Sequence, residues 1–179
     1  MVAGVKGAWR QSVRKDAESY LPEDEKNDVV KAPSLQQIQS LTPNAGEGLK
    51  IFTNSCSVCH KVNETGYDFG PKLTEIGSKL PKESLYEAIV HPSAGISFGY
   101  EGWEIKMKDG SVISGIIASK TETDIDLKFP GGATKHIKTS DVKSMKQLKT
   151  SMMTEGLYAG MSAQDIANLL EYLKGLVKK

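Results

Sequence analysis

The chain has 179 residues, a formal net charge of +1, 39% hydrophobic residues and 25% charged residues. This length and composition fit a globular protein of one or two domains with a core of its own. The near-zero net charge gives no electrostatic reason to bind nucleic acid or an acidic membrane surface, and no run of about 18 apolar residues could form a transmembrane segment.

The first part of the chain, residues 1–44, is expected to be a helical extension followed by a linker. Its apolar residues predict a short amphipathic helix over residues 8–21, and a second, weaker helix is expected over residues 34–41. Residues 22–34 are polar and bounded by prolines, as in a loosely packed linker. No functional residue is identified in this part, and a homodimer contact through the helix that contains Trp9 is a hypothesis.

Two further helices are expected, one before the middle of the chain and one at its end. Residues 44–60 place apolar side chains on a helix that runs into the cysteines. Residues 161–179 have the clearest helical pattern, because Ser162 is a good N-cap and Asp165 follows three residues later. The buried face of this helix is expected to contain Ile166, Leu169, Leu170, Leu173 and Leu176.

Between these helical regions the residues alternate with a period of two, which predicts about five short strands. Asp109-Gly110 and Gly131-Gly132 supply the expected turns. We expect a small antiparallel β-barrel or sandwich over residues 99–145. It would interrupt a helical domain formed by residues 45–98 and 146–179, so the predicted fold class is α+β.

The segment NSCSVCH contains the only two cysteines of the chain, Cys56 and Cys59, and allows several interpretations. A thioredoxin-like dithiol follows a strand at the start of a helix, whereas here a helix is expected before the first cysteine. A structural zinc site needs four ligands, but there is no second cysteine pair, and His91 and His136 are far apart in the sequence. An accidental pair of buried cysteines would leave the adjacent His60 unexplained.

Cys-x-x-Cys-His is also the attachment signature of haem c. Two thiols on one helical turn can reach the two vinyl groups along one edge of a porphyrin, and the next residue can present its imidazole to the iron. We therefore predict one covalently attached haem c, held by Cys56 and Cys59, with His60 as an iron ligand.

Ten residues after His60, the segment GPKLTEIG begins with a Gly-Pro-x-Leu pattern similar to one found at this place in class I cytochromes c. The resemblance implies that the carbonyl of Pro71 accepts a hydrogen bond from Nδ1 of His60, which fixes the tautomer of the ring. It also implies that Leu73 packs against the haem edge. A plain turn before a helix is the alternative interpretation.

The order of motifs along the chain resembles the haem-binding domain of Planctomycete–Verrucomicrobium type. That family combines Cys-x-x-Cys-His, Gly-Pro-Asp-Leu, a Pro-Ser-x-x-Ile-x-x-Gly-Tyr stretch, a β-insert, and Ser-Leu-Met-Pro-x-Gly-Leu before the last helix. This chain has CSVCH, GPKL, HPSAGISFGYEGW, KDGSVISGII and SMMTEGL in the same order, over about residues 45–176. The resemblance implies a mainly α cytochrome c fold interrupted by a β-insert, with Gly48 and Phe52 crossing Leu169 and Tyr172.

The same resemblance implies that Met153 is the second iron ligand, opposite His60. The chain departs from the family pattern at two positions. Lys72 replaces an aspartate at a surface turn, where the change matters little, and Thr154 replaces the proline that normally stiffens the loop after the ligand methionine. Met152 is therefore a competing ligand, and ligation by two histidines is a third interpretation.

These expectations describe an electron-transfer protein rather than an enzyme. Two protein ligands leave no open position on the iron, and a methionine ligand favours the ferrous state. The resemblance implies that the protein carries single electrons between a dehydrogenase domain or partner protein and a respiratory acceptor. The competing hypothesis is a haem-based sensor or small-ligand-binding protein with a labile sixth ligand.

Two further expectations concern the insert and the location of the protein. Tyr100 and Trp103 either contact the haem or fill the interior of the insert, and a third functional hypothesis gives the insert the role of docking a partner. Covalent haem attachment normally follows export, so a periplasmic or otherwise exported location is expected. The start of the chain has no apolar region or cleavage site typical of a signal peptide.

Overall fold

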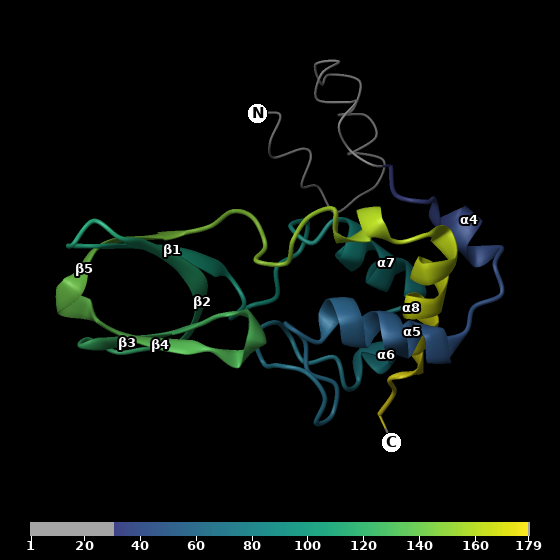
Figure 1. Cartoon of the computed structure of the whole chain (residues 1–179), viewed down its shortest axis with the longest axis horizontal. Helices are drawn as coiled ribbons and strands as arrows, with labels where there is room; N and C mark the ends of the chain where they lie inside the picture. The colour runs from purple at the N-terminus through teal and green to yellow at the C-terminus, as the bar shows by residue number, and fades with distance from the viewer. Residues whose placement is uncertain (1–30, 179) are drawn as a thin grey trace, which may run out of the picture.

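The computed structural model describes residues 31–178, so the helix expected over residues 8–21 and its hypothetical dimer contact lie outside the described residues. The described chain forms a helical part and a five-stranded antiparallel sheet, joined by extended connections (Figure 1). This is the α+β architecture that the sequence predicts. No helix among residues 31–178 is long and apolar enough to cross a membrane.

Five α-helices lie in this described range: α4 Leu35–Gln39, α5 Ala45–Ile51, α6 Ile76–Lys79, α7 Lys82–Val90 and α8 Ala163–Gly175. Three of them begin at capping side chains, because Ser34, Asn44 and Ser162 accept backbone N–H groups of the first turns of α4, α5 and α8. Asp165 bonds back to the backbone of Ser162, which completes the predicted capping box.

Helices α5 and α8 cross closely, and this contact organises the helical core. A Cβ at Gly48 would lie 2.0 Å from the carbonyl oxygen of Asn168, so only glycine lets the two backbones approach so near. The ring centroids of Phe52 and Tyr172 lie 5.5 Å apart across the same contact. The predicted crossing is confirmed, with Asn168 rather than Leu169 opposite Gly48.

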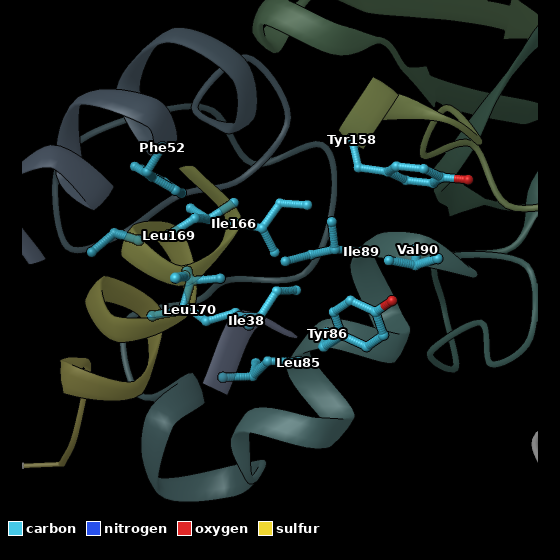
Figure 2. Packing of buried hydrophobic residues seen from close by; sticks show 13 residues of the cluster. Ile38, Phe52, Leu85, Tyr86, Ile89, Val90, Tyr158, Ile166, Leu169 and Leu170 are labelled. Carbon is cyan, nitrogen blue, oxygen red and sulfur yellow. The ribbon is translucent and has the colours of Figure 1, made fainter. Parts of the chain in front are cut away.

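The helical core is built from the apolar faces of α4, α5, α7 and α8 (Figure 2). Its residues meet at the centre of the helical part, where α8 supplies the longest apolar face. Those labelled in Figure 2 are Ile38, Phe52, Leu85, Tyr86, Ile89, Val90, Tyr158, Ile166, Leu169 and Leu170.

Helix α4 packs into this core, although it lies inside the range 1–44 expected to be an extension. Ile38 is only 4% exposed, and the backbone N–H of Asn44 donates to Oδ1 of Asn168 at 2.8 Å. The described end of that range therefore lies against α8. The division of the chain into domains at residue 44 stays a prediction.

The five strands are β1 Gly102–Met107, β2 Val112–Lys120, β3 Asp124–Lys128, β4 Thr134–Lys138 and β5 Val142–Gln147. They form one antiparallel sheet in the order β4-β3-β2-β1-β5, and the sheet curls so that β1 and β2 lie across from β3 and β4 (Figure 1). Ile105, Ile125, Leu127 and Ile137 are buried inside the curl. We call residues 102–147 the β-module; because its core is separate from the helical core, it has packing of its own.

Candidate functional site

A large cavity lies where the helical part meets the β-module. Its volume is about 450 Å³, which falls within the range of about 300–1,000 Å³ usual for small-molecule and cofactor pockets. The wall is mostly apolar and includes no charged side chain from the described part of the chain. Five of the residues singled out by their chemistry line this cavity: Cys56, Cys59, His60, Met152 and Met153.

The CSVCH motif (residues 56–60) begins in the last residue of a widened turn that follows α5. Residues Phe52–Cys56 form a π-helical turn, a feature found frequently at functional sites. The amides of Cys59 and His60 both donate to the carbonyl of Cys56, at 3.0 and 2.9 Å. The motif is thus a compact turn that places both thiols and the imidazole against the cavity.

The two thiols are free and partly buried. Burial raises the pKa of Cys56 to about 11, and the neighbouring Cys59 adds to the shift. Burial also raises the pKa of Cys59. Both sulfurs are therefore kept as neutral thiols at neutral pH, which is the opposite of the activated thiolate that a dithiol oxidoreductase needs.

The ring of His60 is held in one orientation by backbone atoms on its Nδ1 side. Its Nδ1 lies 2.8 Å from the carbonyl oxygen of Pro71 and donates to it, so Nε2 is the nitrogen left with its lone pair. Gly70 lies against the ring, because a Cβ there would be 2.7 Å from Cε1 of His60. Burial lowers the pKa of His60, while the bond to Pro71 acts in the opposite direction. A neutral imidazole is the form that binds a metal.

The remaining part of the Gly-Pro-x-Leu pattern also reaches the cavity. Leu73 lines it and packs against the helical core, and its amide donates to the carbonyl of Lys61 at 2.9 Å. The bond between His60 and Pro71 is the one that the resemblance implies. The alternative of a plain turn does not account for a carbonyl directed at the histidine.

The two candidate methionines lie in a loop that we call the methionine loop, residues 148–156. Both line the cavity, but they have different neighbours. Met153 packs against the helical core, whereas Sδ of Met152 lies 2.8 Å from the position that a Cβ of Gly102 would take. Met152 therefore rests on the start of β1, which leaves Met153 as the methionine associated with the helical part.

Hydrogen bonds fix the backbone of the methionine loop next to Met153. The amide of Ser151 donates to Oγ of Ser93 at 3.0 Å, and the amide of Met153 donates to Oγ of Ser151 at 3.1 Å. Thr154 also lines the cavity. These bonds restrain the loop at the place where the family pattern would have a proline.

The other candidate residues divide into one that lines the cavity and three that do not. Tyr100 lines the cavity, whereas Trp103 lies in β1 away from its wall. His91 follows α7 as its C-cap residue, and His136 lies in β4; neither is part of the wall. Among residues 31–178 no group of three or more His, Cys, Asp and Glu side chains is arranged to hold a metal ion. The zinc interpretation therefore finds no ligand set in the described range.

Sequence reasoning missed the residues that the β-module contributes to the wall. Ile116 in β2 and Pro130 in the turn before β4 both line the cavity. Ile116 belongs to the period-two pattern of a strand, and Pro130 to a turn signal. Neither pattern carries information about a cavity formed with residues 56–60.

The residues present fit a haem c. The cavity wall combines two thiols three positions apart, one imidazole whose second nitrogen is already bonded, and thioether sulfurs from the methionine loop. Cysteine thiols with a histidine and a methionine are the donor set of c-type haem proteins. A mostly apolar wall without charged side chains suits the faces of a porphyrin.

Comparison with known proteins agrees with this donor set. Residues 45–125 match the family model described as cytochrome c. The match contains the CSVCH motif and Pro71 and ends within β3, so the methionine loop and α8 lie beyond it. No curated protein matches the chain.

Proposed function

We propose that the protein is a monohaem c-type cytochrome, because residues 45–125 match the family model described as cytochrome c, a family that implies covalently attached haem and electron transport. It passes single electrons between a dehydrogenase domain or partner protein and a respiratory acceptor. The observation that supports this proposal most directly is that Cys56, Cys59, His60 and Met153 line one apolar cavity.

In this proposal each residue has a separate role in binding the cofactor. Cys56 and Cys59 attach it through their sulfurs, and Nε2 of His60 and Sδ of Met153 are the iron ligands. Pro71 keeps the histidine in the required tautomer through the bond to Nδ1. Leu73 supplies apolar contact at the edge of the cavity.

The bound haem supplies a one-electron iron couple, and the chain sets the conditions for it. With His60 and Met153 as ligands, the iron would have no position for a substrate, as expected for the electron carriers typical of this family. The mostly apolar wall would favour the faces of the haem over water, and a methionine ligand would raise the reduction potential relative to a second histidine. The hydrogen-bonded backbone around Met153 limits movement of the ligand between oxidation states.

Cytochrome c proteins are usually exported, and we place this protein in the periplasm or another exported compartment on that basis. The redox partner would dock near the cavity, where the distance to the cofactor is shortest.

The test is the visible spectrum of the haem-loaded, full-length protein in both oxidation states. Ferric haem with a methionine ligand has a weak red charge-transfer band, which we expect in the wild type and in Met152→Ala but not in Met153→Ala. Survival of the band in Met153→Ala, with loss in Met152→Ala, would move the ligand to Met152.

Absence of the band from the wild type would contradict the His60/Met153 pair. Carbon monoxide binding to the ferrous wild type then separates the remaining interpretations. Ready binding indicates an open or labile position and supports the sensor hypothesis, whereas no binding indicates two tightly held histidines.

A further inference from the structure

The β-module touches the helical part at the CSVCH motif. In the turn formed by Pro130–Gly132, the amide of Gly131 donates to the carbonyl of Val58 at 2.8 Å, and Val58 lies between the two cysteines. Gly132 faces the ring of Tyr67, because a Cβ there would lie 2.7 Å from Cδ1 of that ring. We call this contact the latch.

The latch is a close fit rather than a chance approach. Gly132 has φ +83°, a conformation that favours glycine, and the space that a side chain would need is filled by Tyr67. The backbone of Tyr67 is held in place, because its amide donates to the carbonyl of Ser57 at 2.9 Å. The turn between β3 and β4 is therefore seated against the segment that carries the cysteines.

A second contact, at the same end of the β-module, holds the methionine loop. The amide of Leu148 donates to the carbonyl of Gly102 at 2.8 Å, directly after β5 ends. A Cβ at Gly102 would lie 2.8 Å from Sδ of Met152 and 3.1 Å from Cδ1 of Leu148. The start of β1 and the methionine loop are thus packed together where the loop enters the cavity wall.

These two contacts are joined by paired strands. Gly102 pairs with Ile116, and Ile116 pairs with Lys128, so β1, β2 and β3 connect the methionine loop to the latch side by side. Ile116 and Pro130 also line the cavity. A movement of the module away from Val58 would therefore open the wall and shift the base on which the methionine loop rests.

From this arrangement we propose that the β-module is a clamp that keeps Met153 on the iron, with the latch as the contact that holds it closed. The proposal rests on the proposed function, because it takes His60 and Met153 as the iron ligands. Gly132 and Tyr67 are positioning residues: they touch neither ligand and act through the seating of the module. The module restrains the methionine loop at Leu148 and Met152, and the bond from Ser151 to Ser93 restrains it from the helical part.

The test compares Gly132→Ala with Gly131→Ala in the full-length protein. Both glycines have positive φ, +83° and +78°, so both substitutions strain the turn to a similar extent. Only Gly132→Ala drives a methyl group into Tyr67, since nothing lies within 4 Å of a Cβ at Gly131. Gly131→Ala also keeps the amide that donates to Val58, which makes it a matched control.

The first readout is spectroscopic. We expect Gly132→Ala to lose most of the red charge-transfer band and to have a lower reduction potential, while Gly131→Ala keeps both. Equal loss in the two variants would assign the effect to strain in the turn and overturn the latch. Far-ultraviolet circular dichroism checks that the fold is intact.

The second readout needs no haem. In the haem-free protein, the amides of Ser151 and Met153 should exchange with deuterium about tenfold faster in Gly132→Ala than in the wild type, because opening becomes more frequent. Unchanged exchange in Gly132→Ala would overturn the clamp, whatever the spectrum shows. Absence of the methionine band from the wild-type spectrum would instead contradict the proposed function.

If Gly132→Ala does not fold, Tyr67→Ala carries the same test. This substitution removes the ring against which Gly132 packs and adds no strain to the turn. The side chain of Tyr67 is half exposed, so its loss should affect the core little. We expect a weaker change of both readouts in the same direction. No change in either readout would overturn the proposal.

Discussion

Nδ1 of His60 lies 2.8 Å from the carbonyl oxygen of Pro71, and Gly70 stands against the same ring. Two consecutive residues, Gly70 and Pro71, therefore fix the side chain of His60, which lies ten residues before the first of them. The orientation of the imidazole depends on backbone atoms, which a side-chain substitution elsewhere does not easily disturb.

This arrangement predicts that Gly70→Ala is damaging in spite of its small size. The new methyl group would lie 2.7 Å from Cε1 of His60, so the ring or the backbone has to move. We expect a loss of about 1–3 kcal/mol in the free energy of unfolding of the haem-free protein, as for other overpacked sites, and less covalently attached haem. Chemical denaturation and intact-protein mass spectrometry measure the two effects.

The control for this variant is Gly160→Ala. Nothing lies within 4 Å of a Cβ at Gly160, and its φ is not positive, so both quantities should stay near those of the wild type. Normal stability and normal haem attachment in Gly70→Ala would show that the ring is not confined from this side.

A second prediction concerns the crossing of α5 and α8. A methyl group at Gly48 would lie 2.0 Å from the carbonyl oxygen and 2.6 Å from the carbonyl carbon of Asn168, which are backbone atoms that cannot rotate away. Gly48→Ala should therefore lower the free energy of unfolding by at least about 2 kcal/mol, towards the upper end of the overpacking range. Urea denaturation followed by circular dichroism gives the value.

Gly175→Ala is the matched control, because it replaces a helical glycine that has open space around its Cβ position. Its effect should be neutral or stabilising by up to about 1 kcal/mol, since alanine favours the helix. Similar losses in the two variants would mean that the close approach of the helices is not what makes Gly48 necessary.

A third prediction concerns pH and the outer face of the sheet. Nδ1 of His136 lies 2.8 Å from Asp126 and Nε2 lies 2.9 Å from Asp124, and an imidazole donates from both nitrogens only when it is protonated. The hydrogen bond to Asp126, followed by that to Asp124, raises the pKa of His136 above 6.5. These pairs therefore stabilise the β3–β4 contact fully below about pH 6.5, and the stabilisation is lost as pH rises through the raised pKa.

The measurement is the thermal midpoint of the haem-free protein against pH, in wild type and His136→Gln. The wild type should lose stability relative to the variant as pH rises above 6.5, with a small total effect because the pair is exposed. Parallel curves for the two proteins, or a histidine pKa at or below 6.5 by nuclear magnetic resonance, would contradict the assignment.

Much of this fold follows from local sequence patterns. The capping pair Ser162 and Asp165 marks the start of α8, and the period-two pattern with glycine turns marks the five strands. These features depend on residues close in sequence, so a single chain is enough to recognise them. The bond from His60 to Pro71 was also expected, because both residues belong to a motif of short, defined spacing.

The parts that could not be predicted depend on contacts between distant segments. Helix α4 has one fully buried side chain, Ile38, which is too weak a pattern to distinguish a packed helix from a linker. The latch joins Gly131 to Val58, and no local pattern reports which turn of a sheet meets which loop of another part. The different neighbours of Met152 and Met153 depend on the position of Gly102, which no local pattern gives, and Met153 as the ligand stays a prediction.

The pairing of α5 with α8 also has a consequence for the order of folding. The bond between Asn44 and Asn168 spans 124 positions, so the helical core closes only when two segments far apart in the sequence meet. Until α8 docks on α5, the CSVCH motif lacks the wall residues that α8 supplies, Leu169 and Leu173. Docking of α8 is therefore the step that encloses the two thiols.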